Sequence, residues 1–116
     1  MNNQNLPIEI TKFQVIWLNF WNEDDFRNQT LLQLSKDFAL SGIDISVDLL
    51  RKCQNKESLD CLIEKKIDGH NLNQLLYVID LKEDILQQEI NFIPLIIQRV
   101  AFKVFLRNYL STQNKS

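Results

Sequence analysis

Hydrophobic residues recur along this chain at the spacing expected for α-helices. The first predicted helix begins at Thr11, because Thr11 and Gln14 have the spacing of a capping box, in which each side chain satisfies the other residue's backbone N–H. Its apolar residues fall on one broad face: Phe13, Ile16, Trp17, Phe20 and Trp21. The alternation of Phe13, Val15 and Trp17 also fits a β-strand, which is the less favoured alternative.

Distinct start and stop patterns bound the second predicted helix. Asp24 and Asp25 suit the positive N-terminal end of a helix dipole. The side chains expected to face inward are Phe26, Leu31, Leu34 and Phe38. The helix is predicted to run to about Ser41, because Gly42 can adopt the left-handed conformation that ends many helices.

Shorter helices are predicted in the middle of the chain. Ser46 is expected to cap a third helix of little more than one turn, and Ser58 to cap a fourth that stops near Gly69. Asn71 begins another capping-box pattern and is expected to open a fifth helix. A break is predicted around residues 80–84.

The last predicted helix has the clearest pattern. Asn91 is expected to cap it, and Pro94 is tolerated in the first turn, where its missing N–H costs nothing. The helix is predicted to continue to about Leu110. The fold class is therefore all-α, a compact single-domain bundle of about five to six helices.

Composition supports this fold class and narrows the setting. A chain of 116 residues suits one domain, placed at residues 11–110 between flexible tails at 1–10 and 111–116. Two glycines and two prolines are too few for a β-sandwich or a glycine-rich phosphate loop. The N-terminal residues lack the apolar core of a signal peptide, and no apolar run is long enough to span a membrane. We therefore expect a reduced, cytoplasmic protein without membrane insertion.

Positive charge is concentrated in the last predicted helix. Residues 90–116 contain four basic and no acidic residues, whereas the rest of the chain contains nine basic and fifteen acidic residues. Arg99, Lys103 and Arg107 recur every four residues and form one narrow stripe. The whole chain has a formal charge of −2, which argues against nucleic acid as the partner.

The same helix has two apolar faces, although a surface helix needs only one. The first face comprises Ile93, Ile97, Val100, Ala101 and Val104. The second, across the basic stripe, comprises Leu95, Phe102, Leu106 and Tyr109. Either the helix packs on two sides with its basic stripe along a seam, or the second face meets a partner chain or a second copy, with the basic residues at its rim. The candidate partner-binding residues are Arg99, Phe102, Lys103, Leu106, Arg107 and Tyr109.

Trp17 and Trp21 form a weaker candidate site. Together with Phe13 and Phe20 they build either a large aromatic core or a surface platform for a peptide or ligand. A deep apolar pocket lined by the two tryptophans would favour ligand binding.

Residues 31–54 also invite a helix-turn-helix interpretation, with a turn at Gly42 and Arg51 in the second helix. Asp44 and Asp48 near the start of that second helix oppose contacts with phosphates. Its apolar positions are also out of step by one residue. A purely structural turn is the favoured interpretation.

Residues with catalytic or metal-binding chemistry are sparse. Cys53 and Cys61 do not have the short spacing of a zinc knuckle or a redox pair. His70, the single histidine, lies in a predicted loop with no nucleophile or orienting group that the sequence places beside it. We therefore predict no catalytic residue, no metal site and no cofactor, and do not expect an enzyme.

These patterns favour a small protein-interaction module, such as an adaptor, a regulator or an immunity- or antitoxin-like partner. It would act without catalysis, by burying the apolar face with its basic rim against a protein partner or in a homodimer. One alternative is a nucleic-acid-binding regulator that uses the basic last helix. The other is a helical protein that binds a small molecule.

Overall fold

Helices account for nearly all of the described chain. The computed structural model describes residues 8–67, 69–80 and 92–113, and within these ranges it contains six α-helices, one 3-10 turn and no strand. The elements are α1 (Ile8–Leu18), η2 (Phe20–Asn22), α2 (Asp24–Leu40), α3 (Val47–Arg51), α4 (Lys56–Lys66), α5 (Gly69–Val78) and α6 (Ile93–Gln113). The predicted all-α class is confirmed, and the strand alternative at residues 13–17 is wrong.

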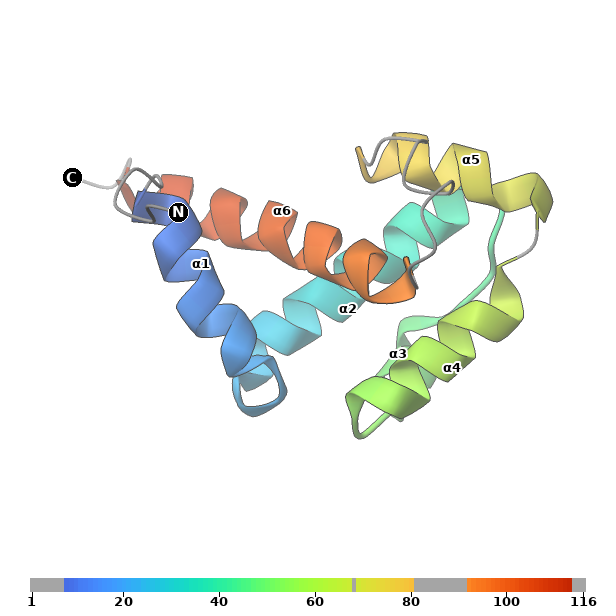
Figure 1. Cartoon of the computed structure of the whole chain (residues 1–116), viewed down its shortest axis with the longest axis horizontal. Coiled ribbons are helices and arrows are strands. Elements are labelled where there is room, and N and C mark those ends of the chain that lie inside the picture. Colours follow the sequence, from blue (N-terminus) through green and yellow to red (C-terminus); the bar gives the residue numbers. More distant parts are fainter. Residues whose placement is uncertain (1–7, 68, 81–91, 114–116) are drawn as a thin grey trace.

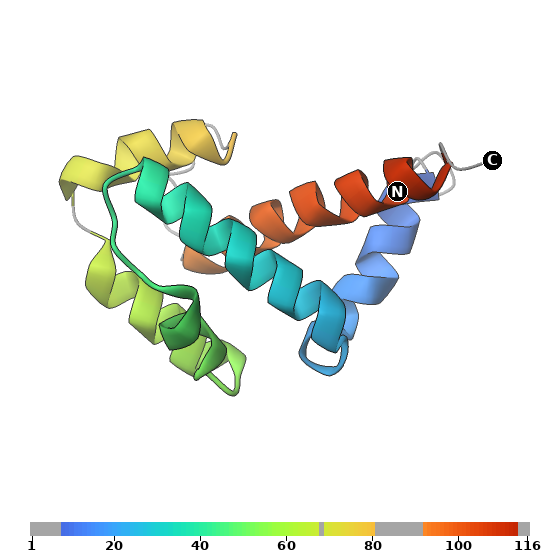
Figure 2. The same cartoon turned by 180° about the vertical axis from the view of Figure 1, so that it is seen from behind.

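The two longest helices, α2 and α6, form the central pair. They cross each other, while α1 closes a triangle with them on one side, and α3, α4 and α5 gather at the other end (Figures 1 and 2). The first predicted apolar face of α6 is buried in this arrangement. The inward residues predicted for α2 are buried as well.

Two hydrophobic clusters hold the helices together. The larger joins α2 to α3, α4, α5 and the N-terminal half of α6, with Phe38, Leu50 and Ile63 fully buried within it. The smaller is largely aromatic and joins α1, η2 and the start of α2 to the C-terminal half of α6 around Phe13 and Phe20. The chain thus has an aliphatic end and an aromatic end, with α6 spanning both.

Some predicted helix boundaries are confirmed. Gly42 has φ 78°, the left-handed conformation expected of the residue that ends α2. Ser46 caps α3, and its hydroxyl accepts a hydrogen bond from the Leu49 N–H at 3.2 Å. The chain also turns after α5, where Asp80 has φ 63°. The rest of the predicted break, residues 81–84, and the predicted Asn91 cap lie outside the described residues.

Other boundaries are wrong by a few residues. α1 begins at Ile8 rather than Thr11, and α6 continues to Gln113 rather than Leu110, so both helices enter the segments predicted as tails. α4 is capped by Asn55, and Ser58 is the third helical residue that completes the capping box. α5 begins at Gly69, not after Asn71.

Candidate functional site

Arg99, the first residue of the predicted basic stripe, binds the C-terminal end of α5. Its Nε donates to the Ile79 carbonyl at 3.1 Å, and its Nη2 lies 3.0 Å from a carboxylate oxygen of Asp80. The guanidinium also lies 5.9 Å from the ring centroid of Phe102. This side chain therefore fastens α6 to the turn after α5.

The other two basic residues of the stripe contact α2. Lys103 Nζ lies 3.1 Å from Asp37 Oδ2, and the Asp37 side chain is only 3% exposed. Gln33 donates to the other Asp37 oxygen at 2.9 Å and accepts a hydrogen bond from Arg107 at 3.1 Å. A polar network thus follows the α2–α6 seam, and each predicted rim charge has a partner within the chain.

The second apolar face of α6 is half-buried. Phe102 meets Phe13 of α1 in an edge-on contact with a centroid separation of 4.9 Å, and Leu106 is partly buried. Tyr109 lies beneath the Lys12 ammonium, 5.2 Å from its ring centroid. α6 therefore packs on two sides, as one of the two interpretations of its faces predicts. That these residues contact a partner stays a prediction.

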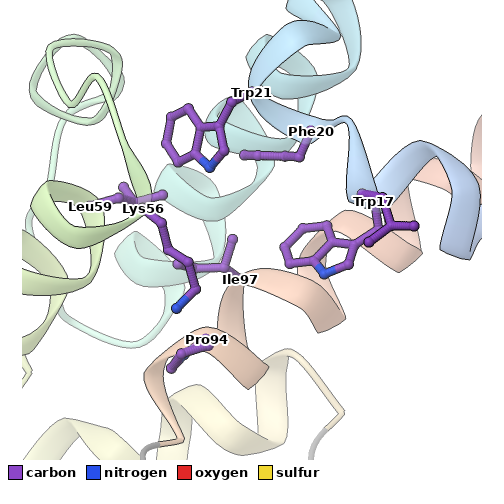
Figure 3. A pocket seen from close by; sticks show the side chains of 8 residues that line it. Trp17, Phe20, Trp21, Lys56, Leu59, Pro94 and Ile97 are labelled. Carbon is purple, nitrogen blue, oxygen red and sulfur yellow. The ribbon is translucent and has the colours of Figure 1, made fainter.

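Trp17 and Trp21 each lie at the boundary between the core and the surface. Phe13 and Phe20 are buried, whereas both tryptophans are half-buried and line one pocket (Figure 3). The pocket has a volume of about 200 Å³ and lies between the α1–η2 corner and the first turns of α4 and α6. Its lining residues are Trp17, Leu18, Phe20, Trp21, Lys56, Leu59, Pro94 and Ile97.

The tight connection between α1 and α2 sets the positions of the two tryptophans. Phe20 lies between them, with its ring centroid 5.1 Å from that of Trp17 and 5.3 Å from that of Trp21. Arg27 of α2 donates to the Trp21 carbonyl at 2.6 Å, and its guanidinium lies 5.9 Å from the Trp21 ring centroid. These contacts within the chain therefore hold the two tryptophans, which form one wall of the pocket, in position.

The opposite wall comes from the beginnings of two helices. Lys56 is the first residue of α4, and the capping box of Asn55 and Ser58 fixes that end. Pro94 is the second residue of α6, a first-turn position that needs no N–H donor. Figure 3 shows Lys56 reaching across this wall toward Pro94.

Two wider hollows flank α1. One of about 310 Å³ lies between α1 and α6 and includes Arg99 and Phe102; the other, of about 340 Å³, includes Tyr109 and the carboxylates Glu23 and Asp25. Both are more open than the pocket at the tryptophans. The predicted α6 residues therefore border shallow surface, whereas Trp17 and Trp21 enclose the deeper space.

Three of the eight described lining residues, Trp17, Phe20 and Trp21, belong to the aromatic group predicted from the sequence, and the other five were not connected with it. Lys56, Leu59 and Pro94 are distant in sequence from the tryptophans and reach the pocket only through the fold. Leu18 had one usable signal, since it is a large apolar residue off the predicted inner face of its helix.

The two cysteines do not line this pocket. Burial raises the pKa of the Cys53 thiol above its ordinary value, and Cys61 is exposed. His70 stands in the first turn of α5, so its predicted loop placement is wrong. Within residues 8–67, 69–80 and 92–113, no three His, Cys, Asp or Glu side chains gather as metal ligands would.

Comparisons with known proteins give no relative. No protein-family model, curated protein or solved structure matches this chain. In the part of the chain that the structure describes, every helix is too short or too polar to cross a membrane. Function must therefore be argued from the geometry of the pocket and its surroundings.

Proposed function

We propose that this chain is a non-catalytic protein-interaction domain that anchors its partner by accepting one large apolar side chain in the pocket between Trp17 and Trp21. The supporting observation is the pocket itself: apolar, enclosed on several sides and walled by two half-buried indoles. Protein interfaces concentrate their binding energy where an anchor residue enters such a desolvated pocket.

The size of the pocket favours a side chain over a free small molecule. Small-molecule sites usually have volumes of roughly 300–1,000 Å³. The pocket at the tryptophans measures about 200 Å³. It suits one aliphatic or aromatic side chain, with the rest of the partner lying on the surrounding surface.

Apolar residues continue from the pocket mouth along α1. Leu18, at the mouth, is 84% exposed, and Ile8 and Val15 are also largely exposed. Their spacing of seven and ten residues places all three on one outward face of the helix. An apolar stripe beside an apolar pocket is the surface pattern expected of a protein-binding site.

The pocket is a better anchor than the basic stripe of α6. Arg99, Lys103 and Arg107 each contact another part of the chain. A partner that used these charges would first have to compete with those contacts. Nucleic acid is a less favoured partner for the same reason, because it would have to bind the same stripe.

Intrinsic fluorescence provides a direct test. The chain has two tryptophans and both line the pocket, so their emission reports on its occupancy. We expect peptides selected from a random display library against the folded protein to shift this emission and to protect it from acrylamide quenching. Peptides that bind without affecting either tryptophan would contradict the proposal.

A matched pair of variants locates the binding. Leu18→Gln removes an apolar side chain from the pocket mouth and should weaken the selected peptides about five- to tenfold. Leu40→Gln makes the same change at the exposed end of α2, which is 69% exposed and lies outside the pocket. It should leave affinity unchanged, and equal losses from both variants would place the binding elsewhere.

A further inference from the structure

We infer that the anchored side chain belongs to a partner segment in which a carboxylate stands next to it, so that the apolar group fills the pocket and the carboxylate meets Lys56 and the indole N–H groups. This inference rests on the proposed function and specifies the chemistry of the partner. The supporting observation is that the polar side chains around the pocket are hydrogen-bond donors.

Among the described residues that line the pocket, every side-chain polar atom is a donor. These donors are the Lys56 ammonium and the two indole N–H groups of Trp17 and Trp21, none of which can accept a hydrogen bond. Neither indole N–H donates to another described residue. Neither N–H is among the buried polar atoms without a partner, so both are accessible to solvent, and a ligand in the pocket can supply their acceptor.

The backbone adds positive potential on the same side. α4 begins at Lys56, and α6 begins one residue before Pro94, so the first turns of two helices border the pocket. The N-terminal end of a helix carries a partial positive charge that favours anions. The positive potential of these two helix ends and of the Lys56 ammonium favours a negatively charged group in the pocket.

Lys56 already has a neighbour, and its ammonium can bind a second carboxylate. Its Nζ lies 3.3 Å from Asp60 Oδ2, one turn along α4; the Lys56 side chain is 56% exposed and the Asp60 side chain 17% exposed. An ammonium has three donors, so Asp60 does not use them all. A partner carboxylate can therefore bind the same ammonium, with Asp60 as its competitor.

Three peptide probes vary the carboxylate and the apolar side chain separately. They are glycine- and serine-based peptides with a central Leu–Asp, Leu–Asn or Ala–Asp pair, titrated by tryptophan emission. We expect the Leu–Asp peptide to bind about three- to tenfold more tightly than Leu–Asn, because only the former offers a charged acceptor. Ala–Asp should bind more weakly still, because it leaves the pocket unfilled.

Variants of the protein identify the side chain that binds the carboxylate. Lys56→Gln should remove most of the preference for Leu–Asp over Leu–Asn, whereas Lys66→Gln, at the exposed far end of the same helix, should preserve it. Asp60→Asn removes the competitor and should tighten Leu–Asp binding about two- to threefold. A merely structural role for Lys56 would not produce this gain.

The outcomes separate the two proposals. If Leu–Asp and Leu–Asn bind equally and Leu18→Gln still weakens both, the carboxylate is overturned and the pocket stands. If no peptide alters tryptophan emission, the proposed function fails as well. If N-acetyl-leucine binds as tightly as the Leu–Asp peptide, the occupant is a small carboxylate and the partner segment is overturned.

Discussion

The α2–α6 seam and the tryptophan pocket both combine apolar surface with polar groups. They differ in whether those polar groups have hydrogen-bond partners within the chain. Along the seam, the buried Asp37 receives hydrogen bonds from Lys103 and Gln33. At the pocket, two indole donors have no partner among the described residues. A network satisfied within the chain contributes to stability, whereas donors left open toward a cavity remain available to a ligand.

The strongest test of this contrast removes the ring that supports the pocket. Phe20 is 3% exposed and separates the two tryptophans. Phe20→Ala should lower the free energy of unfolding by about 3–5 kcal/mol through the cavity it creates. Urea denaturation followed by circular dichroism measures this loss. Leu18→Ala, at the exposed mouth, should change stability by less than about 0.5 kcal/mol.

The seam itself is broken by removing its lysine. Lys103→Met leaves the buried Asp37 carboxylate without its ammonium and should cost about 2–3 kcal/mol, less than a fully enclosed pair because Lys103 is partly exposed. Adding Asp37→Asn should recover part of the loss in the same denaturation assay. Lys36→Met, on the exposed side of α2, is the control. Equal effects of Lys36→Met and Lys103→Met would show that the seam is not a stabilising network.

A smaller effect is expected at Arg27, which links the start of α2 to Trp21. Arg27→Met removes the hydrogen bond to the Trp21 carbonyl and the contact with its ring. We expect a loss of about 0.5–1.5 kcal/mol and greater quenching of tryptophan emission by acrylamide. Arg51→Met, at the exposed end of α3, should alter neither. Unchanged quenching in Arg27→Met would mean that Trp21 is held by its ring packing alone.

Sequence reasoning predicted the helices better than their ends. The fold class, the buried face of α6 and the Ser46 cap follow from local patterns that the tertiary structure reinforces. The cap of α4 was misplaced because Asn55 and Ser58 are both good capping residues, and only their reciprocal hydrogen bonds show which one precedes the helix. The helix start at Ile8 has no strong cap residue to mark it, because Pro7 precedes it. Before Gly69, Asp68 is a good cap residue, but the capping-box spacing of Asn71 and Gln74 favours a later start.

The candidate site was harder to predict because it combines three distant segments. Trp17 and Trp21 stood out by their spacing, but the opposite wall comes from Lys56 and Pro94. The basic stripe illustrates the reverse problem. Its spacing predicts one narrow stripe, along a seam or at the rim of a binding face, but it does not identify Asp37 and Gln33, which are remote in sequence and bind two of its three side chains.

The attachment of α1 has a consequence for dynamics. Phe13 is the one buried side chain among the described residues of this helix, yet α1 supplies Trp17 and Leu18 to the pocket wall. Local opening starts where few side chains are buried, so the amides of α1 should exchange with solvent earlier than those of α2. Each undocking of α1 would dismantle the pocket. An occupant would therefore slow this exchange, and its observed affinity would include the free energy of holding α1 in place.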